Sequence, residues 1–477
     1  MMAITDCTEK NNKKANYWIG LIIAFLLGSF SLSILSFDSY FMIAYSRNIL
    51  KNGFQQATEF LSVHNNLDFM YQKWLMCFLT DFIYSHFGNV GLLIAGDVMF
   101  GLLLAVLYYA LNKINPKSAN NNIVIIILTA IALCRYVPFR PHVFAAIFLI
   151  FEYLAFRNPD KYFYIKCFFI SLLIMWFHST MWYVVLIFAL PFIVDSFFSK
   201  KNIKKYFIGT GIMVLASFLQ PNGIHQWSYM INCLRATGKK YSYISELLPI
   251  THNPRQLIIF SILLIVLAVI CIKQRKISRI NIFWVLGSIA MAFTAERLTF
   301  YSVIILALAI AEEIVGIKYN TKLIKGFTAI IIALALIYGY FCSTMLISSC
   351  KKIEDNTGIT LCDEFVEKYG KNHKVFCDPD IGSYLEMYGV KVYYDTRAEV
   401  YDIAINHKKD ITQEFYDLTR SKYKGKSFST ESIKELEEDY GFDYWVINKN
   451  TTFKKIIDDA GYVKVLEDEN RIIYKKK

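Results

Sequence analysis

Charged residues are scarce in this chain. They make up 19% of the 477 residues, against about 25% in an average soluble domain, whereas 55% of the residues are hydrophobic. Proline is also rare, with 9 copies, while phenylalanine alone contributes 38. This composition excludes a disordered chain, a collagen and an ordinary cytosolic enzyme.

Acidic residues are rarest in the first 350 positions. Residues 1–350 contain 29 Lys and Arg but only 14 Asp and Glu, whereas residues 351–477 contain 22 and 25. The formal charge is therefore +15 on the first part and −3 on the second. Because the basic part is also the apolar part, we interpret its charge as membrane topology and expect no nucleic-acid partner. The sequence predicts a multi-span membrane domain at 1–350 and a small soluble domain at 351–477.

Several metal, redox and nucleotide motifs are missing. The ten cysteines are scattered from Cys7 to Cys377 with no CxxC and no paired Cys/His spacing, which argues against a zinc site. No Rossmann fingerprint or P-loop is present, so the sequence has no recognisable cradle for a soluble nucleotide. A disulfide stays open, because Cys350, Cys362 and Cys377 could form one in an oxidising compartment.

Long apolar stretches are what the chain has instead. A span needs about 20 apolar residues, and eleven stretches qualify. The first is too long for a removed signal peptide and lacks the small-residue cleavage site of one. The eleven predicted spans are 17–37, 90–111, 122–139, 141–157, 162–178, 180–198, 204–220, 256–273, 281–297, 299–317 and 324–345.

The stretch 68–87 decides the orientation. It is apolar but contains four ionisable residues, and we predict a helix on the membrane surface rather than a twelfth span. With that choice the Lys-rich short loops all fall on one side, which the positive-inside rule places in the cytoplasm. The N-terminus of this multi-pass cell-membrane protein is then cytoplasmic. The 351–477 domain is extracytoplasmic, as are two large loops at 38–89 and 221–255.

The C-terminal part has the pattern of a small α/β domain. Short β-branched and aromatic runs alternate with helical stretches, which is typical of a sheet covered by helices. We predict strands at 374–377, 390–394 and 443–448, helices at 381–388, 431–439 and 451–460, and a final hairpin at 461–476.

Polar residues gather on the predicted outer face in five separate segments. Each has an ordinary explanation by itself, such as a headgroup anchor or an ion pair. Together they describe an outward-opening cavity with an acid/base group and phosphate-binding cations. By contrast, we interpret Glu59 and Asp81 as the solvated face of amphipathic surface helices. The gathered residues include Arg140, His142, His178, Asn222, His225, Glu246, Glu296 and Arg297.

Asp38 is the strongest candidate for a general base. It directly follows the first span, where a lipid phosphate would lie, and aromatic residues rather than a charged stripe surround it. A carboxylate in a partly dry, aromatic setting is a stronger base than one in water. The alternative is that Asp38 caps a helix that begins at Ser39. Asp68 and Glu246 are the next candidates, and either could join Asp38 in holding a divalent metal.

The order of the local motifs resembles the GT-C glycosyltransferase superfamily. Its better-known members include the protein O-mannosyltransferases and the aminoarabinose transferases of lipid A. The resemblance runs along nearly the whole chain, with one departure at Lys73, where relatives often have an acidic residue. The motifs are FDSYFMIAYSRNILKNG, YQKWL, FRPHVF, WFHST, QPNGIHQW, YISELLP, ERLTFYS and GSYLEMYGVKVYYDTRAEVY.

The resemblance implies transfer of a sugar from a polyprenyl-phosphate carrier in the membrane lipid to an extracytoplasmic glycan, lipid or protein. In an inverting transfer, a carboxylate takes the acceptor's hydroxyl proton while cations hold the departing phosphate. No cofactor is certain, and a divalent metal stays open. The implied roles are catalysis for Asp38, Asp68 and Glu246, and donor-phosphate binding for Arg140, His142, His178 and Arg297. Asn222, His225, Glu296, Asp395 and Arg397 are assigned to acceptor binding or support, with Asp395 and Arg397 fixing strand-to-loop geometry.

Two other functions fit the same topology. One is a polysaccharide polymerase or ligase, and the other is a non-catalytic transporter or flippase of lipid-linked glycans. Transporters tend to show repeated halves and interrupted spans. The sequence shows neither, and its large first loop and outer domain favour an enzyme. The sequence names neither the sugar nor the acceptor.

Overall fold

The computed structural model describes most of the chain. The described residues are 17–29, 34–54, 58–116, 119–134, 138–237, 244–314 and 350–477, with single helical positions between 326 and 337. The predicted span at 324–345 lies largely outside them.

Contacts divide the chain into two compact units. The helical unit comprises Met1–Ile34, Leu93–Gln220 and Ile244–Met345. The mixed unit comprises Leu35–Leu92, Pro221–Tyr243 and Leu346–Lys477. This grouping differs from a division at residue 350, because two earlier segments cluster with the C-terminal part.

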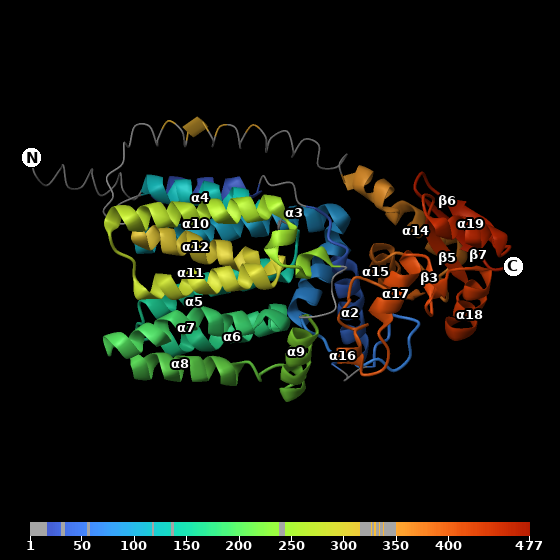
Figure 1. The fold of residues 1–477 in the computed structure, drawn as a ribbon, viewed down its shortest axis with the longest axis horizontal. Helices are drawn as coiled ribbons and strands as arrows, with labels where there is room; N and C mark the ends of the chain where they lie inside the picture. The colour runs from blue at the N-terminus through green and yellow to red at the C-terminus, as the bar shows by residue number, and fades with distance from the viewer. Residues whose placement is uncertain are drawn as a thin grey trace, which may run out of the picture. The chain divides into compact units, whose positions relative to one another are not determined.

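Helices with nearly aligned axes fill the helical unit (Figure 1). Their sequences are apolar around most of the circumference, as expected of helices that are surrounded by other helices or by lipid. Neighbours in sequence pack together, such as α5 on α6 and α11 on α12. The bounds are α4 (Ala119–Leu133), α5 (Pro141–Arg157), α6 (Phe163–His178), α7 (Tyr183–Ser199), α8 (Ile203–Ala216), α10 (Pro254–Gln274), α11 (Arg279–Thr294) and α12 (Thr299–Glu313).

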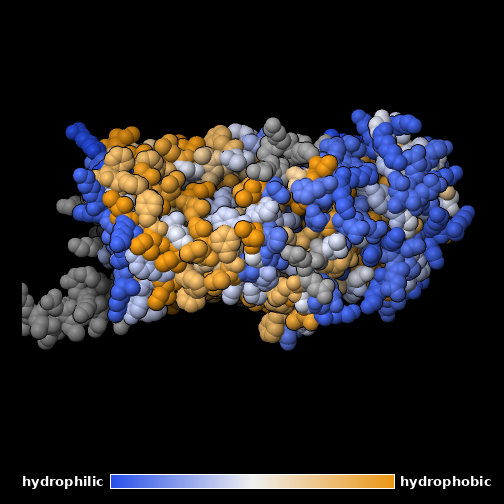
Figure 2. Space-filling view, turned by 90° about the horizontal axis from the view of Figure 1, so that it is seen from below, coloured by the Kyte–Doolittle hydropathy of each residue, from blue (hydrophilic) through white to orange (hydrophobic). Residues whose placement is uncertain are grey.

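Three described helices are long and apolar enough to cross a membrane: Trp74–Ile114, Phe163–Met181 and Pro254–Gln274. Shorter apolar helices include Tyr17–Ser29 and Tyr183–Ser199. Figure 2 shows hydrophobic residues over the sides of the helical unit and a hydrophilic rim where its helices end. The number of crossings therefore stays a prediction.

Three described basic residues, Lys113, Arg157 and Arg279, lie at one end of the helical unit. Arg157, at the end of α5, pairs with Glu312 in α12 (Nε–Oε1 2.8 Å) and donates to the carbonyl of Lys113 (3.5 Å). Arg279, at the start of α11, pairs with Asp195 in α7 (Nε–Oδ1 3.5 Å). Within the described residues, the loop ends at Lys113 and Arg157 thus lie together, as do the end of α7 and the start of α11. Which side of the membrane they face stays a prediction.

Helix α3 (Trp74–Ile114) contains a break at Gly88, where the backbone has φ 59° and ψ −154°. Glycine adopts this conformation without the strain that a Cβ would bring. The break separates 74–87 from the rest of the helix, in agreement with the predicted boundary between a surface helix and the span at 90–111.

A five-stranded sheet lies at the centre of the mixed unit, in the order β2-β1-β5-β7-β6. β1 is parallel to β2 and β5, and β7 is antiparallel to β5 and β6. β5 reads YWVIN and four of its five residues are buried, as expected for a central strand. The strands are β1 (Lys374–Phe376), β2 (Lys391–Val392), β5 (Tyr444–Asn448), β6 (Val463–Glu467) and β7 (Arg471–Lys475).

Helices surround this sheet at the predicted places. α15 (Pro379–Tyr388), α18 (Thr430–Tyr440) and α19 (Thr452–Asp459) match the three predicted helices to within two residues. The sequence analysis missed three further helices and a short hairpin, which are α14 (Ile359–Tyr369), α16 (Ile403–Asn406), α17 (Ile411–Thr419), and β3 (Lys422–Tyr423) with β4 (Lys426–Ser427). The described cysteines of this part, Cys350, Cys362 and Cys377, are free thiols.

The first external loop also contributes to the sheet. It contains α2 (Asp38–Asn52) and then, before α3, an extended segment. Ser62 forms a parallel bridge with Val392, and the amide of Val63 donates to the Val392 carbonyl (2.8 Å). The segment Leu61–His64, which we call the edge segment, thus pairs with β2 at the border of the sheet. The loop 38–89 is therefore only partly made of helices.

Candidate functional site

Arg140 stands at the end of the helical unit opposite the Lys-rich loops. Its backbone is extended (φ −133°, ψ 153°) because the next residue, Pro141, opens α5 and disfavours a helical conformation before it. The guanidinium pairs with Glu246 (Nη1–Oε1 3.2 Å), which lies in the short helix η3 (Ser245–Leu247). Both side chains are partly exposed, so the pair can open to a ligand at small cost.

Two histidines lie at the same end. The His142 ring packs edge-on against Phe300 at the start of α12, with 4.7 Å between ring centroids. His178 ends α6, and its Nδ1 is 3.2 Å from the Thr180 hydroxyl. Stacking of Phe144 on Phe177 (4.4 Å) brings the start of α5 beside the end of α6. Both imidazoles are half-buried and can donate or accept a proton.

Glu296 and Arg297 complete this group. They belong to η5 (Glu296–Leu298), which packs on η3. The Glu296 side chain is buried and accepts a hydrogen bond from Asn253 Nδ2 (2.8 Å), while its amide donates to the Leu248 carbonyl (2.7 Å). Glu296 thus fixes the loop that carries Glu246. Arg297 is half-buried, and its Nε has no hydrogen-bond partner among the residues described.

The structure therefore gathers six predicted residues at one end of the helical unit. We call this the bundle-end cluster: Arg140, His142, His178, Glu246, Glu296 and Arg297. Two guanidiniums and two imidazoles against two carboxylates can hold a phosphate by charge-assisted hydrogen bonds. Of these residues, Arg297 is best able to bind a further anion. Its buried Nε–H has no acceptor among the described residues, and a buried N–H without an acceptor is unfavourable until an anion provides that acceptor.

Asp38 lies in the mixed unit and opens α2. The residue before it, Phe37, takes the N-cap position and makes no side-chain cap. The alternative role of Asp38 as the cap of a helix that begins at Ser39 is therefore wrong by one residue. Its carboxylate instead lies in the first turn, where the helix dipole stabilises negative charge. It is half-buried, and two residues close to it in the sequence, Phe37 and Tyr40, have their rings 5.6 Å apart. Its role as base stays a prediction.

The remaining predicted residues have less suggestive settings. Asp68 is exposed and forms an isolated β-bridge with Thr58. Asn222 is buried and donates to Gln226 (2.9 Å) at the start of α9 (Ile224–Thr237), where His225 is exposed. No group of three His, Cys, Asp or Glu residues in the described parts of the chain is placed to hold a metal ion. A divalent metal thus gains no support.

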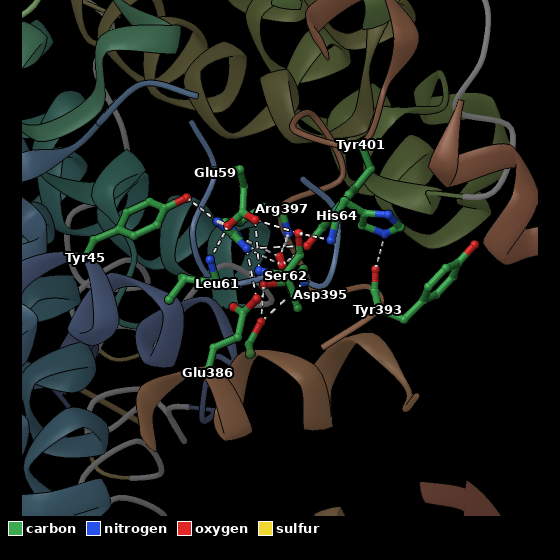
Figure 3. A network of polar contacts seen from close by, with 12 residues as sticks. Tyr45, Glu59, Leu61, Ser62, His64, Glu386, Tyr393, Asp395, Arg397 and Tyr401 are labelled. Carbon is green, nitrogen blue, oxygen red and sulfur yellow. Dashed lines mark hydrogen bonds and ion pairs between the residues drawn. The ribbon is translucent and has the colours of Figure 1, made fainter. Parts of the chain in front are cut away.

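Asp395 and Arg397 lie in a buried network of the mixed unit (Figure 3). We call the network the Arg397 clamp: Arg397, Asp395, Glu386, Glu59, Tyr45 and Tyr401. The guanidinium reaches Glu59 Oε1 and Glu386 Oε1 (both 2.9 Å), Asp395 Oδ1 (2.9 Å) and the Tyr45 hydroxyl (2.7 Å). The Tyr401 hydroxyl donates to Asp395. The side chains of Arg397 and its three carboxylate partners are at most 1% exposed.

Three carboxylates share one guanidinium, and the pKa values of two of them, Asp395 and Glu386, shift in opposite directions. Burial is the largest effect on Asp395 and raises its pKa, but the charge of Arg397 and the hydrogen bonds from Arg397, Glu386 and Tyr401 together hold that pKa below its usual range. Burial raises the pKa of Glu386 well above its usual range in spite of Arg397, and the negative Asp395 adds to the rise. Burial and the negative Asp395 thus disfavour a charge on Glu386, and a weaker charge on one of the three carboxyls lowers the cost of burying them together.

The interpretation of Glu59 and Asp81 as solvated residues is wrong. Glu59 is buried in the Arg397 clamp and also accepts from the amides of Leu61 and Ser62 (both 2.8 Å). Asp81 is buried between Ser46 (2.8 Å) and Arg47 (3.3 Å) of α2. The sequence contained one signal for Glu59, since it lies outside any helical repeat and directly before an apolar run. Tyr45, Glu386 and Tyr401 lie within motifs that carried the resemblance, but the sequence analysis gave them no role.

Comparisons with known proteins add the fold class. No protein-family model and no curated protein matches the sequence. The crystal structure of ArnT from Cupriavidus metallidurans bound to undecaprenyl phosphate matches with a TM-score of 0.55 and 11% identity. That match covers 96% of this chain and 97% of ArnT.

An Archaeoglobus fulgidus oligosaccharyltransferase matches as well. Its structure, tethered with an acceptor peptide containing the NVT sequon, gives a TM-score of 0.50 and 10% identity, over 91% of this chain and 69% of that one. Both structures share the fold of this chain over most of its length, in agreement with the fold that the motif resemblance implies. At these identities the likeness shows the fold alone.

Proposed function

We propose that this protein is an integral membrane glycosyltransferase that moves a sugar from a polyprenyl-phosphate donor to an extracytoplasmic acceptor. The observation that carries the proposal is the bundle-end cluster in a chain of GT-C fold. The printed ligand of ArnT, undecaprenyl phosphate, supports a lipid phosphate as the group to be bound. The acceptor is a cell-envelope glycan, lipid or protein.

The chemistry of the cluster suits the donor. Arg297, with its unpartnered Nε, takes the phosphate first, and Arg140 joins it by exchanging Glu246 for the anion. His142 and His178 add donors that strengthen as the phosphate leaves. Glu296 holds the loop in place through Asn253 and does not touch the donor. Asp38 takes the proton of the acceptor hydroxyl as general base, in an inverting transfer.

The finer topology is part of the proposal. Eleven crossings with a cytoplasmic N-terminus place the Lys-rich end of the helical unit inside and the bundle-end cluster at the outer headgroup level. The grouping of Lys113, Arg157 and Arg279 at one end supports this orientation. The sheet of the mixed unit then belongs to an extracytoplasmic domain.

A direct test uses the purified full chain in lipid nanodiscs. The wild type is incubated with radiolabelled polyprenyl-phosphate sugars and cell-envelope lipids, and transfer is followed by the appearance of labelled acceptor. Transfer supports the proposal. Movement of a lipid-linked glycan across the bilayer without transfer contradicts it and favours a flippase.

Donor binding tests the cluster separately. Losing a hydrogen bond to a charged group costs about 1.5–3 kcal/mol, so Arg140→Ala, His178→Ala and Arg297→Ala should each weaken binding of undecaprenyl phosphate roughly 10- to 150-fold. The matched control is Arg279→Ala, an exposed arginine at the opposite end of the helices. If all three variants bind as well as the control, the phosphate lies elsewhere.

A further inference from the structure

Three residues of α2 form one stripe along the helix. Asp38, Phe41 and Tyr45 are spaced i, i+3 and i+7, which puts them within about 60° of one another around an axis with 3.6 residues per turn. Phe41 and Tyr45 are buried, with 5.4 Å between ring centroids in an edge-on contact. The direction of the Asp38 carboxylate is therefore tied to whatever holds the two rings.

The Arg397 clamp holds those rings. The guanidinium carbon is 5.3 Å from the Tyr45 ring centroid and 5.9 Å from that of Phe41. Arg397 Nη1 also donates to the Tyr45 hydroxyl (2.7 Å). Cation–π contact and hydrogen bond together fix the stripe by its side chains rather than by its backbone.

The opposite face of α2 has its own anchors. The Tyr40 hydroxyl donates to Asn89 (2.9 Å), and Arg47 pairs with Asp81 of α3 (3.3 Å). Tyr40 and Arg47 lie roughly 180° from Asp38 around the helix. Two sets of contacts on opposite sides determine the rotation of α2 about its axis, and the clamp is the set on the side of Asp38.

Arginine is suited to this task in a way that lysine is not. Its planar guanidinium offers five N–H donors in a fixed fork, and here they reach Asp395, Glu386, Glu59 and Tyr45 at once. Three of these partners come from outside α2, so the fork is itself immobilised. Because the guanidinium cannot rotate, its hydrogen bond to the Tyr45 hydroxyl holds the Tyr45 side chain in one position.

We propose that the Arg397 clamp is a positioning device for Asp38, with Tyr45 as the residue that transmits it. This inference rests on the proposed function and on Asp38 as its base. The clamp touches no substrate. It sets the rotation of α2, and with it the direction in which the Asp38 carboxylate meets the acceptor hydroxyl.

The test removes one hydroxyl. Tyr45→Phe keeps the ring and its packing but deletes the hydrogen bond from Arg397. A misplacement of ~1 Å can cost about 10²-fold in rate, and we expect the smaller shift here to lower kcat about tenfold with the donor KM unchanged. The matched control is Tyr394→Phe, a buried tyrosine of the same unit whose hydroxyl donates to Thr412 (3.4 Å) and which lies outside the clamp.

A double variant separates positioning from general damage. In an Asp38→Asn background the proposed base is absent, so its position no longer affects the rate. Adding Tyr45→Phe should therefore lower the residual rate less than twofold. If the two changes multiply instead, Tyr45 does not act through Asp38. Hydrogen exchange of the α2 amides supplies a readout without catalysis, and Tyr45→Phe should raise it above the level of Tyr394→Phe.

The outcomes distinguish the two proposals. An active wild type in which Tyr45→Phe and Tyr394→Phe have equal kcat and equal α2 exchange overturns the positioning role alone. A wild type that transfers no sugar from any polyprenyl-phosphate donor overturns the proposed function, and the positioning of a base falls with it. Arg397→Lys, which keeps the charge but loses the fork, should lower kcat at least as much as Tyr45→Phe.

Discussion

At the scale of single residues, the mixed unit contains two carboxylates, Asp38 and Glu59, in different surroundings. Asp38 is half-buried at the start of a helix, whereas Glu59 is fully buried beside a guanidinium. A half-buried carboxylate can exchange protons with an incoming hydroxyl, while a buried and fully bonded one holds structure. The two acids should therefore respond to amide substitution in different ways.

Asp38→Asn should strongly lower turnover without unfolding the protein. Asparagine fits the first turn of α2 but cannot take a proton, so kcat should fall about 10²- to 10⁴-fold, the usual contribution of a general base. Melting temperature and kcat are measured together. The matched control is Asp380→Asn, the same change in the first turn of α15 at an exposed position. Near-normal turnover in well-folded Asp38→Asn would exclude this base and turn attention to Asp68 and Glu246.

Glu59 and Glu386 should differ in their effects on stability. Burial raises the pKa of Glu386 and disfavours its negative charge, and Glu386→Gln keeps the shape of the side chain without that charge, so we expect a change below about 1 kcal/mol. Glu59 accepts from Arg397 and two backbone amides, and Glu59→Gln turns an N–H toward those donors. Breaking a buried pair costs about 3–5 kcal/mol. Thermal unfolding of the two variants in parallel checks the order, and equal melting temperatures would contradict it.

At the scale of elements, the edge segment Leu61–His64 joins the external loop to the sheet. Its backbone pairs with β2, and His64 Nε2 lies 2.7 Å from the Tyr393 carbonyl. The ring is surrounded by Tyr393, Tyr401 and Tyr440. This element has one backbone partner strand and one histidine, so it is the part of the sheet most sensitive to acid.

The edge segment should loosen on acidification. Burial lowers the pKa of His64 from 6.5 to about 4, against the opposing effect of the Tyr393 carbonyl. Between these two pH values the unfolded segment binds a proton that the folded one does not. The stability of the folded segment therefore decreases by about 1.4 kcal/mol for each unit by which the pH drops. The contribution is fully present above pH 6.5. Hydrogen exchange of residues 61–64 at pH 7 and pH 5 measures it, and His64→Gln should remove the difference.

The contact between α15 and the end of β2 depends on a glycine. A Cβ at Gly382 would lie 2.3 Å from the Tyr394 carbonyl oxygen, a distance at which backbone must move. Gly382→Ala should therefore destabilise the mixed unit by about 1–3 kcal/mol. Gly211→Ala in α8, where a Cβ meets nothing within 4 Å, is the matched control. Denaturant unfolding should show a loss only in the first variant, and a loss of equal size in both would disprove the packing argument.

At the scale of the whole molecule, orientation in the membrane is the property that the charges predict. Among the described residues, Lys113, Arg157 and Arg279 lie at the same ends of their helices, as the positive-inside rule requires of a single cytoplasmic face. Fusions to a reporter that works only in the cytoplasm should be active after residue 200 and inactive after residue 350. An active fusion at 350, or an inactive one at 200, would reverse the topology.

The fold is shared with a structure that has very low sequence identity to this chain. An 11% identical structure matches over 96% of the chain because the helices require only apolar residues of suitable length, which many sequences supply. The short motifs that carried the resemblance lie largely at helix ends and in the mixed unit. There, glycine, proline, arginine and carboxylates have specific partners, and substitution is more restricted.

The sequence by itself determined the local and periodic features. Apolar runs defined the helices, alternation of strand and helix patterns defined β1, β5 and the final hairpin, and the charge balance grouped the basic loops. These features depend on neighbours a few residues apart, or on hydropathy summed over a span, and both can be read along the chain. Most of the bundle-end residues were also found this way, because they sit at the ends of apolar runs, whereas Glu246 was found in the second external loop.

Only the tertiary structure decided which polar residues are partners. Glu59 and Arg397 are 338 positions apart in sequence, and nothing in either local pattern indicates a fully buried ion pair. The sequence alone made Glu59 a solvated residue and left Tyr45 and Glu386 unnoticed. The physical reason is that burying a charge depends on the summed geometry of several partners, each of which folding brings in from a different segment.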